Sequence, residues 1–271
     1  MIKIEKIKVE GWEPAIRGMR NPLDSWGKSD AVFYDLEDLD EFTLYCHDIN
    51  GDIKMLNPFD ANEWGDGRFN IGPNDLNLMM KLAKSGTEHA KYRRMIVVWM
   101  DITAPLYWWK EFDTYKVGTV ADSCSTMHTI ANKEFTLDDF SCEHLGYYNP
   151  ETDQYEIVEP IDFNNNSIVD TPTDILLETI KTLNEYRKRY KATGDKRYWW
   201  QLIQLLPSSY NQKRTVMLNY EVLANIYRQR RNHKLDEWHV FCDMIEEELP
   251  YSQLITFKGE MEKEIADGER C

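Results

Sequence analysis

Hydrophobic and polar residues alternate in some stretches of this chain and follow a helical spacing in others. In residues 1–12, aliphatic residues stand between charged ones with one slip of phase, which predicts a strand. The run Met95–Ile102 is almost wholly apolar and rich in β-branched residues, as in a buried strand. Residues 21–72 are rich in Asp, Gly and Asn, and predict loops and short strands.

Helical spacing dominates the remaining apolar positions. Pro73, Asn74 and Asp75 predict the start of a helix that continues to Gly86. Ala104-Pro105 is expected to open another, because Pro is tolerated at the first helical position. The last hundred residues are expected to be helical, in segments that begin at Thr173 and Asp174 and continue over Tyr198–Leu206, about Lys213–Arg231 and about Leu235–Leu249.

These elements predict an α+β fold in which a central sheet is flanked by long helices. A hairpin is expected between helices near residues 146–163. We expect one compact domain, made of a strand and loop-rich extension over residues 1–80, a core over residues 81–255 and an acidic tail over residues 256–271.

The net charge of −15 argues against a general nucleic-acid binder, whose affinity depends on many phosphate contacts. Residues 205–234 nevertheless contain six Lys or Arg and one acid, including the cluster 228–234. A phosphate site would use such arginines as planar, always-charged donors. Alternatively, bases near a helix C-terminus favour the macrodipole and pair with acids of the segment that follows, residues 235–271.

Asn219 and Asn225 are unusual in the predicted helix that contains this cluster. Asn is a poor residue for a helix interior, because its side chain competes for backbone hydrogen bonds. Together with Arg230 they are expected to line one pocket that offers amides and a cation. A solvated helix face is the alternative for either Asn alone.

A family resemblance is visible in the same residues. Leu206-Pro207, followed by Asn219, Asn225 and Arg230, is similar to the C-terminal signature of flavin-dependent thymidylate synthases. The resemblance implies that Asn219 and Asn225 bind FAD, and that Arg230 is catalytic by binding and polarising the uracil ring of dUMP. It also implies a homotetramer that uses methylene-tetrahydrofolate and NADPH.

A second match lies upstream, where residues 84–89 resemble a family turn whose histidine contacts flavin, a role that falls here to His89. At the place of the family's R-H-R-x-x-S motif the chain has residues 114–119, so that the first Arg and the His are absent. Lys116 replaces one cation and is expected to bind the cofactor phosphate. Thr119 supplies the hydroxyl and Asp122 the acid expected at the nucleotide.

The sequence leaves several functions open. The favoured one is flavin-dependent methylation of dUMP or a related pyrimidine nucleotide. A second enzyme would use another acceptor or carbon donor on the same fold. A catalytically inactive nucleotide-binding or scaffold protein is the alternative from another class, because Thr114 and Tyr115 replace the Arg and His. A nucleic-acid module that uses residues 228–234 is disfavoured by the net charge.

The other reactive residues predict structural roles. The five cysteines are scattered and never form a C-x-x-C pair, which indicates reduced thiols in a cytoplasmic protein. Cys124 could act as a nucleophile, although a structural thiol is the simpler interpretation. The six histidines lack the spacing of zinc ligands, so we expect no metal site. No apolar run is long enough to predict a membrane span.

Overall fold

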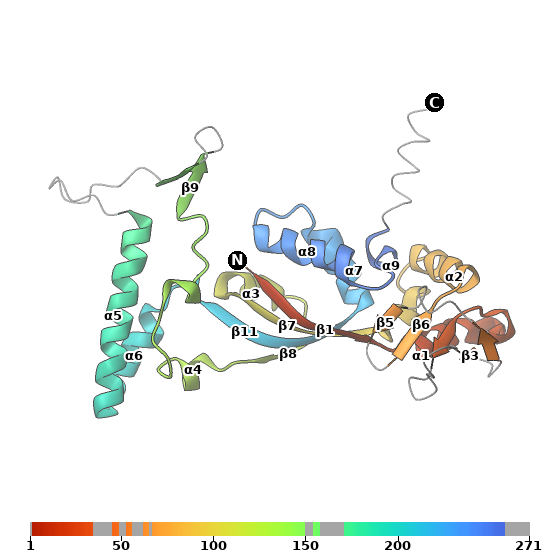
Figure 1. Ribbon diagram of the computed structural model, residues 1–271, viewed down its shortest axis with the longest axis horizontal. Helices are drawn as coiled ribbons and strands as arrows, with labels where there is room; N and C mark the ends of the chain where they lie inside the picture. The colour runs from red at the N-terminus through yellow and green to blue at the C-terminus, as the bar shows by residue number, and fades with distance from the viewer. Residues whose placement is uncertain are drawn as a thin grey trace. The chain divides into compact units, whose positions relative to one another are not determined.

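The computed structural model describes residues 2–34, 45–48, 53–55, 62–64, 67–149, 154–157 and 171–257 (Figure 1). The described part combines helices with sheets that helices flank, which confirms the predicted α+β class. The acidic run 35–40 and residues 164–166, each expected from the sequence to form a turn, lie outside the described residues, as does the tail from residue 258.

The described chain divides into two compact units. The first contains residues 1–3, 102–114 and 122–214, and the second contains residues 4–101, 115–121 and 215–271. A four-stranded sheet has the order β1-β7-β11-β8. Each of these four strands has residues in both units. Their bounds are β1 Lys3–Glu10, β7 Val97–Pro105, β8 Val120–Ser123 and β11 Asn211–Asn219.

The strands follow the hydrophobic pattern closely. The slip of phase in β1 coincides with Lys6, whose φ of 57° lies in the left-handed region and interrupts the strand's regular alternation. In β7, buried and half-buried side chains alternate up to Pro105. The strand therefore continues further than predicted, and α3 (Leu106–Phe112) begins directly after Pro105, which is its N-cap and not its first helical residue.

The predicted helix over about Lys213–Arg231 is wrong in its first part. Residues up to Asn219 form the strand β11, and α7 (Tyr220–Arg230) begins only after it. Val216 and Leu218 are both buried and two positions apart, which is the period of a strand. Those two positions also fit a helical spacing with the apolar residues of α7. The sequence pattern therefore predicted a single helix where the structure has a strand followed by a helix.

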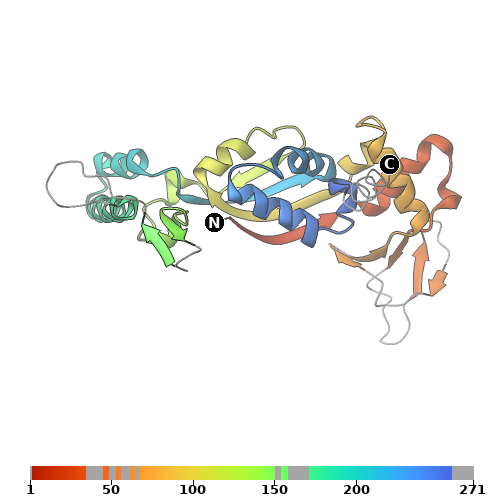
Figure 2. The same cartoon turned by 90° about the horizontal axis from the view of Figure 1, so that it is seen from above.

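The second unit also holds a five-stranded antiparallel sheet, which confirms the short strands predicted over residues 21–72 (Figure 2). Its order is β4-β3-β2-β6-β5, with β2 Val32–Tyr34, β3 Tyr45–Asp48, β4 Ile53–Met55, β5 Asn62–Trp64 and β6 Gly67–Asn70.

The helices of the second unit bury a core of aromatic rings. The Trp12 ring stacks on Phe69 at 5.0 Å and meets Tyr220 edge-on at 5.2 Å between ring centroids. In this unit α7 and α8 lie along one face of the four-stranded sheet (Figures 1 and 2). The helical elements are α1 Trp12–Arg20, η1 Asn21–Leu23, η2 Trp26–Lys28, α2 Pro73–Lys84, η5 Ala90–Arg94, α7, α8 Asp236–Glu248 and α9 Gln253–Thr256. The helix predicted from Pro73 is confirmed, whereas α1 was not predicted.

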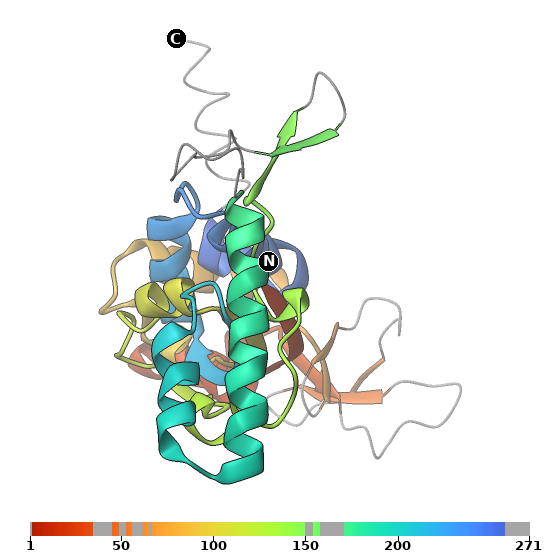
Figure 3. The same ribbon diagram turned by 90° about the vertical axis from the view of Figure 1, so that its left-hand side faces the viewer.

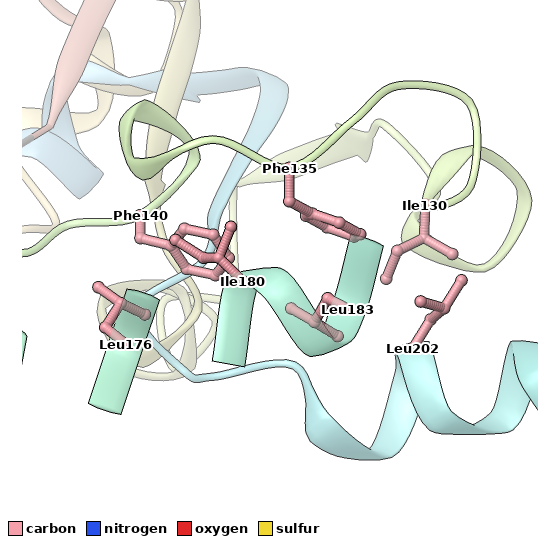
Figure 4. Close-up of a cluster of buried hydrophobic side chains, with 7 residues drawn as sticks. All are labelled: Ile130, Phe135, Phe140, Leu176, Ile180, Leu183 and Leu202. Atoms are coloured by element: carbon pink, nitrogen blue, oxygen red, sulfur yellow. The ribbon is translucent and has the colours of Figure 1, made fainter. Parts of the chain in front are cut away.

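The first unit is built around the paired helices α5 (Pro172–Thr193) and α6 (Lys196–Leu205), which lie side by side (Figure 3). Thr171 caps α5 together with Asp174, two residues before the predicted start at Thr173. The core of this unit is a cluster of seven buried side chains: Ile130, Phe135, Phe140, Leu176, Ile180, Leu183 and Leu202 (Figure 4).

The remaining elements of the first unit are short: α3, α4 (Thr126–Thr129), η6 (Leu137–Asp139) and the hairpin of β9 (Gly146–Asn149) and β10 (Gln154–Ile157). The described part of the hairpin agrees with its prediction. Over the described ranges, no helix combines the length and apolarity needed to cross a bilayer.

Candidate functional site

Asn219 lies at the junction of β11 and α7 and caps the helix. Its Oδ1 accepts a hydrogen bond from the Val222 backbone N–H at 3.1 Å. A side-chain oxygen at this position satisfies one of the N–H groups that have no partner within the helix. Because the oxygen is engaged by the backbone, the Nδ2 group is the part of Asn219 that can donate to a ligand.

The turn at residues 116–119 packs directly on this cap. Gly118 has a φ of 78°, and a Cβ there would lie 3.0 Å from Asn219 Nδ2 and 3.1 Å from Val222 Cγ2. Only Gly meets both conditions without strain. The turn that holds Lys116 and Thr119 is therefore fixed beside the first residue of the predicted flavin pair.

The guanidinium of Arg230 is held between aromatic rings at the end of α7. Its Nε donates to Tyr115 Oη at 2.8 Å, and its Cζ lies 5.6 Å from the centre of the Tyr115 ring. The buried Trp238 of α8 lies on it at 4.9 Å. Cation–π contacts of this kind contribute about 0.5–2 kcal/mol and restrict the rotation of the side chain.

A chain of hydrogen bonds connects Arg230 with Asn225 through two further side chains. Tyr115 Oη donates to Gln229 Oε1 at 3.0 Å, and Gln229 Nε2 donates to Asn225 Oδ1 at 2.9 Å. The same oxygen of Asn225 accepts from Arg228 at 2.9 Å. Two predicted site residues thus belong to one network, in which Asn225 keeps its Nδ2 donor for a ligand.

The sequence interpretation missed three members of this arrangement. Gln229 could have been found, since it lies four residues after Asn225 and therefore on the same helix face. Tyr115 was considered only as a replacement for a histidine, and Trp238 was given no role. No local pattern predicts that these two rings enclose Arg230, because their meeting depends on tertiary packing.

The other predicted residues take different positions. Thr119 Oγ1 is buried and has no hydrogen-bond partner in the described part of the chain. Lys116 and His89 are exposed in the second unit, and His89 directly precedes η5, which packs against α7. Asp122 is exposed in β8 and belongs to the first unit.

The replaced motif positions have structural partners. Thr114 Oγ1 donates to the Glu111 carbonyl at 2.7 Å, so its hydroxyl closes the last turn of α3. Tyr115 uses its hydroxyl both as donor and as acceptor. Cys124 is exposed in the first unit, and its Sγ lies 3.8 Å from Thr129 Oγ1.

The basic cluster divides into two kinds of cation. Arg231 pairs with α8, at 2.6 Å from Asp243 and 3.3 Å from Glu246, as the structural interpretation of the cluster predicts. Burial, together with the adjacent Glu246, also raises the pKa of Tyr227 well above its ordinary value. Arg230 instead faces Tyr115 and Trp238. Arg230 is therefore the arginine of the cluster whose aromatic setting suits ligand recognition.

No protein-family model matches this chain, and no curated protein sequence does either. Among the solved structures with a similar fold are two of an enzyme from Helicobacter pylori. One is the flavin-dependent thymidylate synthase of Helicobacter pylori complexed with FAD and dUMP, 14% identical, with a TM-score of 0.55 over 94% of this chain and 98% of that chain.

The other is thymidylate synthase X of Helicobacter pylori with FAD and dUMP, 12% identical, with a TM-score of 0.55 over 95% of this chain and 98% of that chain. At identities this low, the structural similarity establishes a common fold but no common sequence motif. The likeness nevertheless extends over almost the whole of each chain. The protein has the fold of a flavin-dependent thymidylate synthase.

Proposed function

We propose that this protein binds FAD and methylates dUMP, or a related pyrimidine nucleotide, at carbon 5 of the uracil ring. The observation that carries the proposal is the Arg230 guanidinium, which a hydrogen bond and two rings fix beside residues of the predicted flavin site. Its support is the fold, shared with an enzyme that was solved with FAD and dUMP.

The residues of the second unit fit a ligand of this kind. The buried Thr119 hydroxyl has no partner among the described residues, which is costly unless a ligand or water supplies one. Asn219 and Asn225 both have their amide oxygens engaged, so each offers an N–H donor. Flavin and uracil rings carry carbonyl oxygens that accept such donors. The turn glycine lets the backbone approach closely, where a Cβ would fill the space.

The proposed roles follow from these chemical groups. Arg230 would donate to a uracil oxygen and stabilise the negative charge that develops there during the reaction. Lys116 would attract the phosphate of the cofactor, while Thr119 and Asp122 would bind the nucleotide. Asn219, Asn225 and His89 would orient the flavin. When bound, reduced flavin supplies the hydride, with methylene-tetrahydrofolate as carbon donor and NADPH as the source of electrons. The proposal includes a homotetramer.

A catalytically inactive nucleotide-binding protein is the second candidate. The observation that favours it is the engagement of the hydroxyls of Thr114 and Tyr115 by protein groups, at the positions where the family has a cation and an imidazole. Both candidates require Arg230 for nucleotide binding. Only the first requires turnover.

The decisive experiment measures binding and turnover separately. FAD is titrated into the apo-protein and followed by quenching of its fluorescence, and dUMP binding is measured by calorimetry. We expect saturable binding of both at micromolar concentrations. Tritium release from C5-labelled dUMP is then measured with FAD, NADPH and methylene-tetrahydrofolate. Absence of saturable FAD binding would remove the proposal, whereas binding without release would select the inactive candidate.

The exposed thiol provides a control for the mechanism. Cys124→Ala should release tritium at the parental rate, because the proposed chemistry uses hydride transfer and no cysteine adduct. Loss of release in a variant with parental circular dichroism would contradict the hydride mechanism and favour attack by a thiolate.

A further inference from the structure

A second candidate site lies in the second unit, among residues that the proposed flavin chemistry does not use. An open pocket of about 610 Å³ lies between the end of α1, η1, η2 and the first turns of α2. Pockets of this volume accommodate small metabolites. Arg20 and Lys28 line it, and among the described residues that line it none is acidic. In a chain of net charge −15, a pocket with this lining is conspicuous.

Arg20, which lines the pocket, is 4% exposed. Its Nε donates to Asp75 Oδ1 at 2.7 Å, and its Nη1 donates to the Ser25 carbonyl at 3.3 Å. Its Nη2 has no acceptor in the described part of the chain. The guanidinium is therefore held in one orientation by the protein and keeps donor capacity for a ligand.

The partner carboxylate of Arg20 is itself saturated. Asp75 is fully buried, and its Oδ2 accepts from Ser29 Oγ at 2.5 Å and from the backbone N–H groups of Asp30 and Ala31 at 2.9 Å each. A carboxylate with four donors orients the arginine and has little remaining capacity to attract a further cation. It balances the charge of Arg20, so the exposed Lys28 is the cation among the lining residues that has no carboxylate partner in the described part of the chain.

The remaining walls supply neutral donors and an apolar surface. Asn74 contributes an exposed amide at the start of α2, where Asp30 already accepts from its backbone N–H at 2.8 Å. The binding capacity therefore comes from side chains and not from the helix end. Leu23 and Leu78 line the pocket with apolar side chains, and Leu23 is 83% exposed.

We propose that this pocket binds the phosphate group of a small phosphate monoester, separately from the Arg230 site. Arg20 and Lys28 would bind the phosphate oxygens, since a fixed guanidinium fork matches their geometry and an ammonium adds charge. Asn74 would donate a further hydrogen bond. Leu23 and Leu78 would contact an apolar group on the ester oxygen, so that the ester binds more tightly than free phosphate.

The test uses the full chain, with inorganic phosphate and phenyl phosphate as probes at constant ionic strength. Calorimetry should show saturable binding of both, with phenyl phosphate tighter. Lys28→Glu should weaken binding about tenfold, the effect of losing one charge-assisted contact. Lys81→Glu makes the same charge change on an exposed part of α2 outside the pocket lining and should bind within about twofold of the parent.

Three results would overturn the proposal: no saturable binding by the parent, equal weakening by Lys28→Glu and Lys81→Glu, or an equal loss of FAD affinity in Lys28→Glu. The last would make the pocket part of the flavin site. Arg20→Lys provides a further variant but breaks a buried pair, so it is interpreted only if its circular dichroism is parental. Failure of FAD or dUMP to bind the parent would refute the proposed function and leave this inference intact.

Discussion

The hydrogen bonds of Tyr115 show why this residue cannot simply take the place of a histidine ligand. Its hydroxyl accepts from Arg230 and donates to Gln229, which are the principal capacities of a phenol. Tyr115 is also buried against Trp238. It therefore acts as a positioning residue for Arg230, and Arg230 itself is the cation that the proposed function assigns to the nucleotide.

Replacement of Arg230 should affect nucleotide binding more than replacement of its neighbour. Arg230→Ala should lose roughly 1.5–3 kcal/mol of dUMP affinity, which is at least about tenfold, because a charge-assisted contact disappears. Arg228→Ala is the matched control, since Arg228 is exposed and bonds only to Asn225 among the partners seen here. Calorimetry with dUMP measures both. A loss of dUMP affinity confined to Arg228→Ala would show that the family resemblance assigns the uracil-binding role to the wrong arginine.

Asn219 allows its structural and its proposed binding function to be separated. Asn219→Asp keeps an oxygen for the Val222 N–H and should unfold at nearly the parental denaturant concentration, since Asp is a good N-cap. It removes the amide donor and places a negative charge beside the proposed flavin, so FAD affinity should fall about tenfold. Asn219→Ala should lose both, with about 0.5–2 kcal/mol of stability. Parental FAD affinity in Asn219→Asp would exclude Asn219 from the flavin site.

At the scale of elements, the strand-to-helix junction at Asn219 shows what the sequence could predict. Val216, Leu218, Leu223 and Ile226 are all buried, and their spacing suits one helix as well as a strand followed by a helix. Periodicity alone cannot decide between them, and a mid-pattern Asn was the available signal for a boundary. The strand β7 and the helix from Pro73 carried clear patterns, and both were predicted.

Members of the candidate site could be predicted from the sequence where they lie on one element, and not where their meeting depends on packing. Asn225 and Arg230 share α7, and their residue types together with the family resemblance marked them as candidates. Tyr115 and Trp238 come from a loop and another helix, and only the fold brings their rings to Arg230. The division of the chain near residue 80 and all the site roles stay predictions: those of Arg230, Asn219, Asn225, Lys116, Thr119, Asp122 and His89.

The turn at Gly118 can be tested with a second glycine as its reference. Gly118→Ala should destabilise the protein because a Cβ meets both a positive φ and the Asn219 and Val222 side chains. Gly86→Ala has a φ of 98° with open space around the Cβ, so it reports the backbone strain alone, about 1–2 kcal/mol. Urea denaturation should show the larger loss for Gly118→Ala, together with weaker FAD binding. Equal losses would mean that the turn does not rest on the cap.

At the scale of the whole molecule, the cations of the two candidate sites stand out against an acidic chain. The chain carries 47 acids against 32 Lys and Arg, yet the two candidate sites gather their cations around Arg230 and around Arg20 with Lys28. In a strongly acidic protein, such local cations are what would attract anionic ligands.

A homotetramer should elute with about four times the chain mass of 32.1 kDa, and a monomer mass by light scattering would contradict that part of the proposal.

The buried neutral groups give the protein a dependence on alkaline pH whose sign is determined. Burial raises the pKa of Cys242 from 9.0 to about 12 and that of Tyr92 from 10.0 to about 12. The folded state therefore binds more protons than the unfolded state above pH 9, and the free energy of unfolding should fall as the pH rises from 9 to 12. Each unit of pKa shift corresponds to about 1.4 kcal/mol.

Urea denaturation at pH 8, 9, 10 and 11 measures this dependence. Cys242→Ala removes one of the titrating groups, so its unfolding free energy should fall less steeply than the parent's between pH 9 and 11, whatever its stability at pH 8. Tyr92→Phe should flatten the profile only above pH 10, and it also loses the bond that Tyr92 Oη donates to the Met79 carbonyl at 2.8 Å. Cys124→Ala is the matched thiol control, because Cys124 is exposed. Profiles for Cys242→Ala and Cys124→Ala that run parallel to the parent's would show that the Cys242 thiol titrates alike in the folded and unfolded chains, and that its burial does not act on the protonation equilibrium.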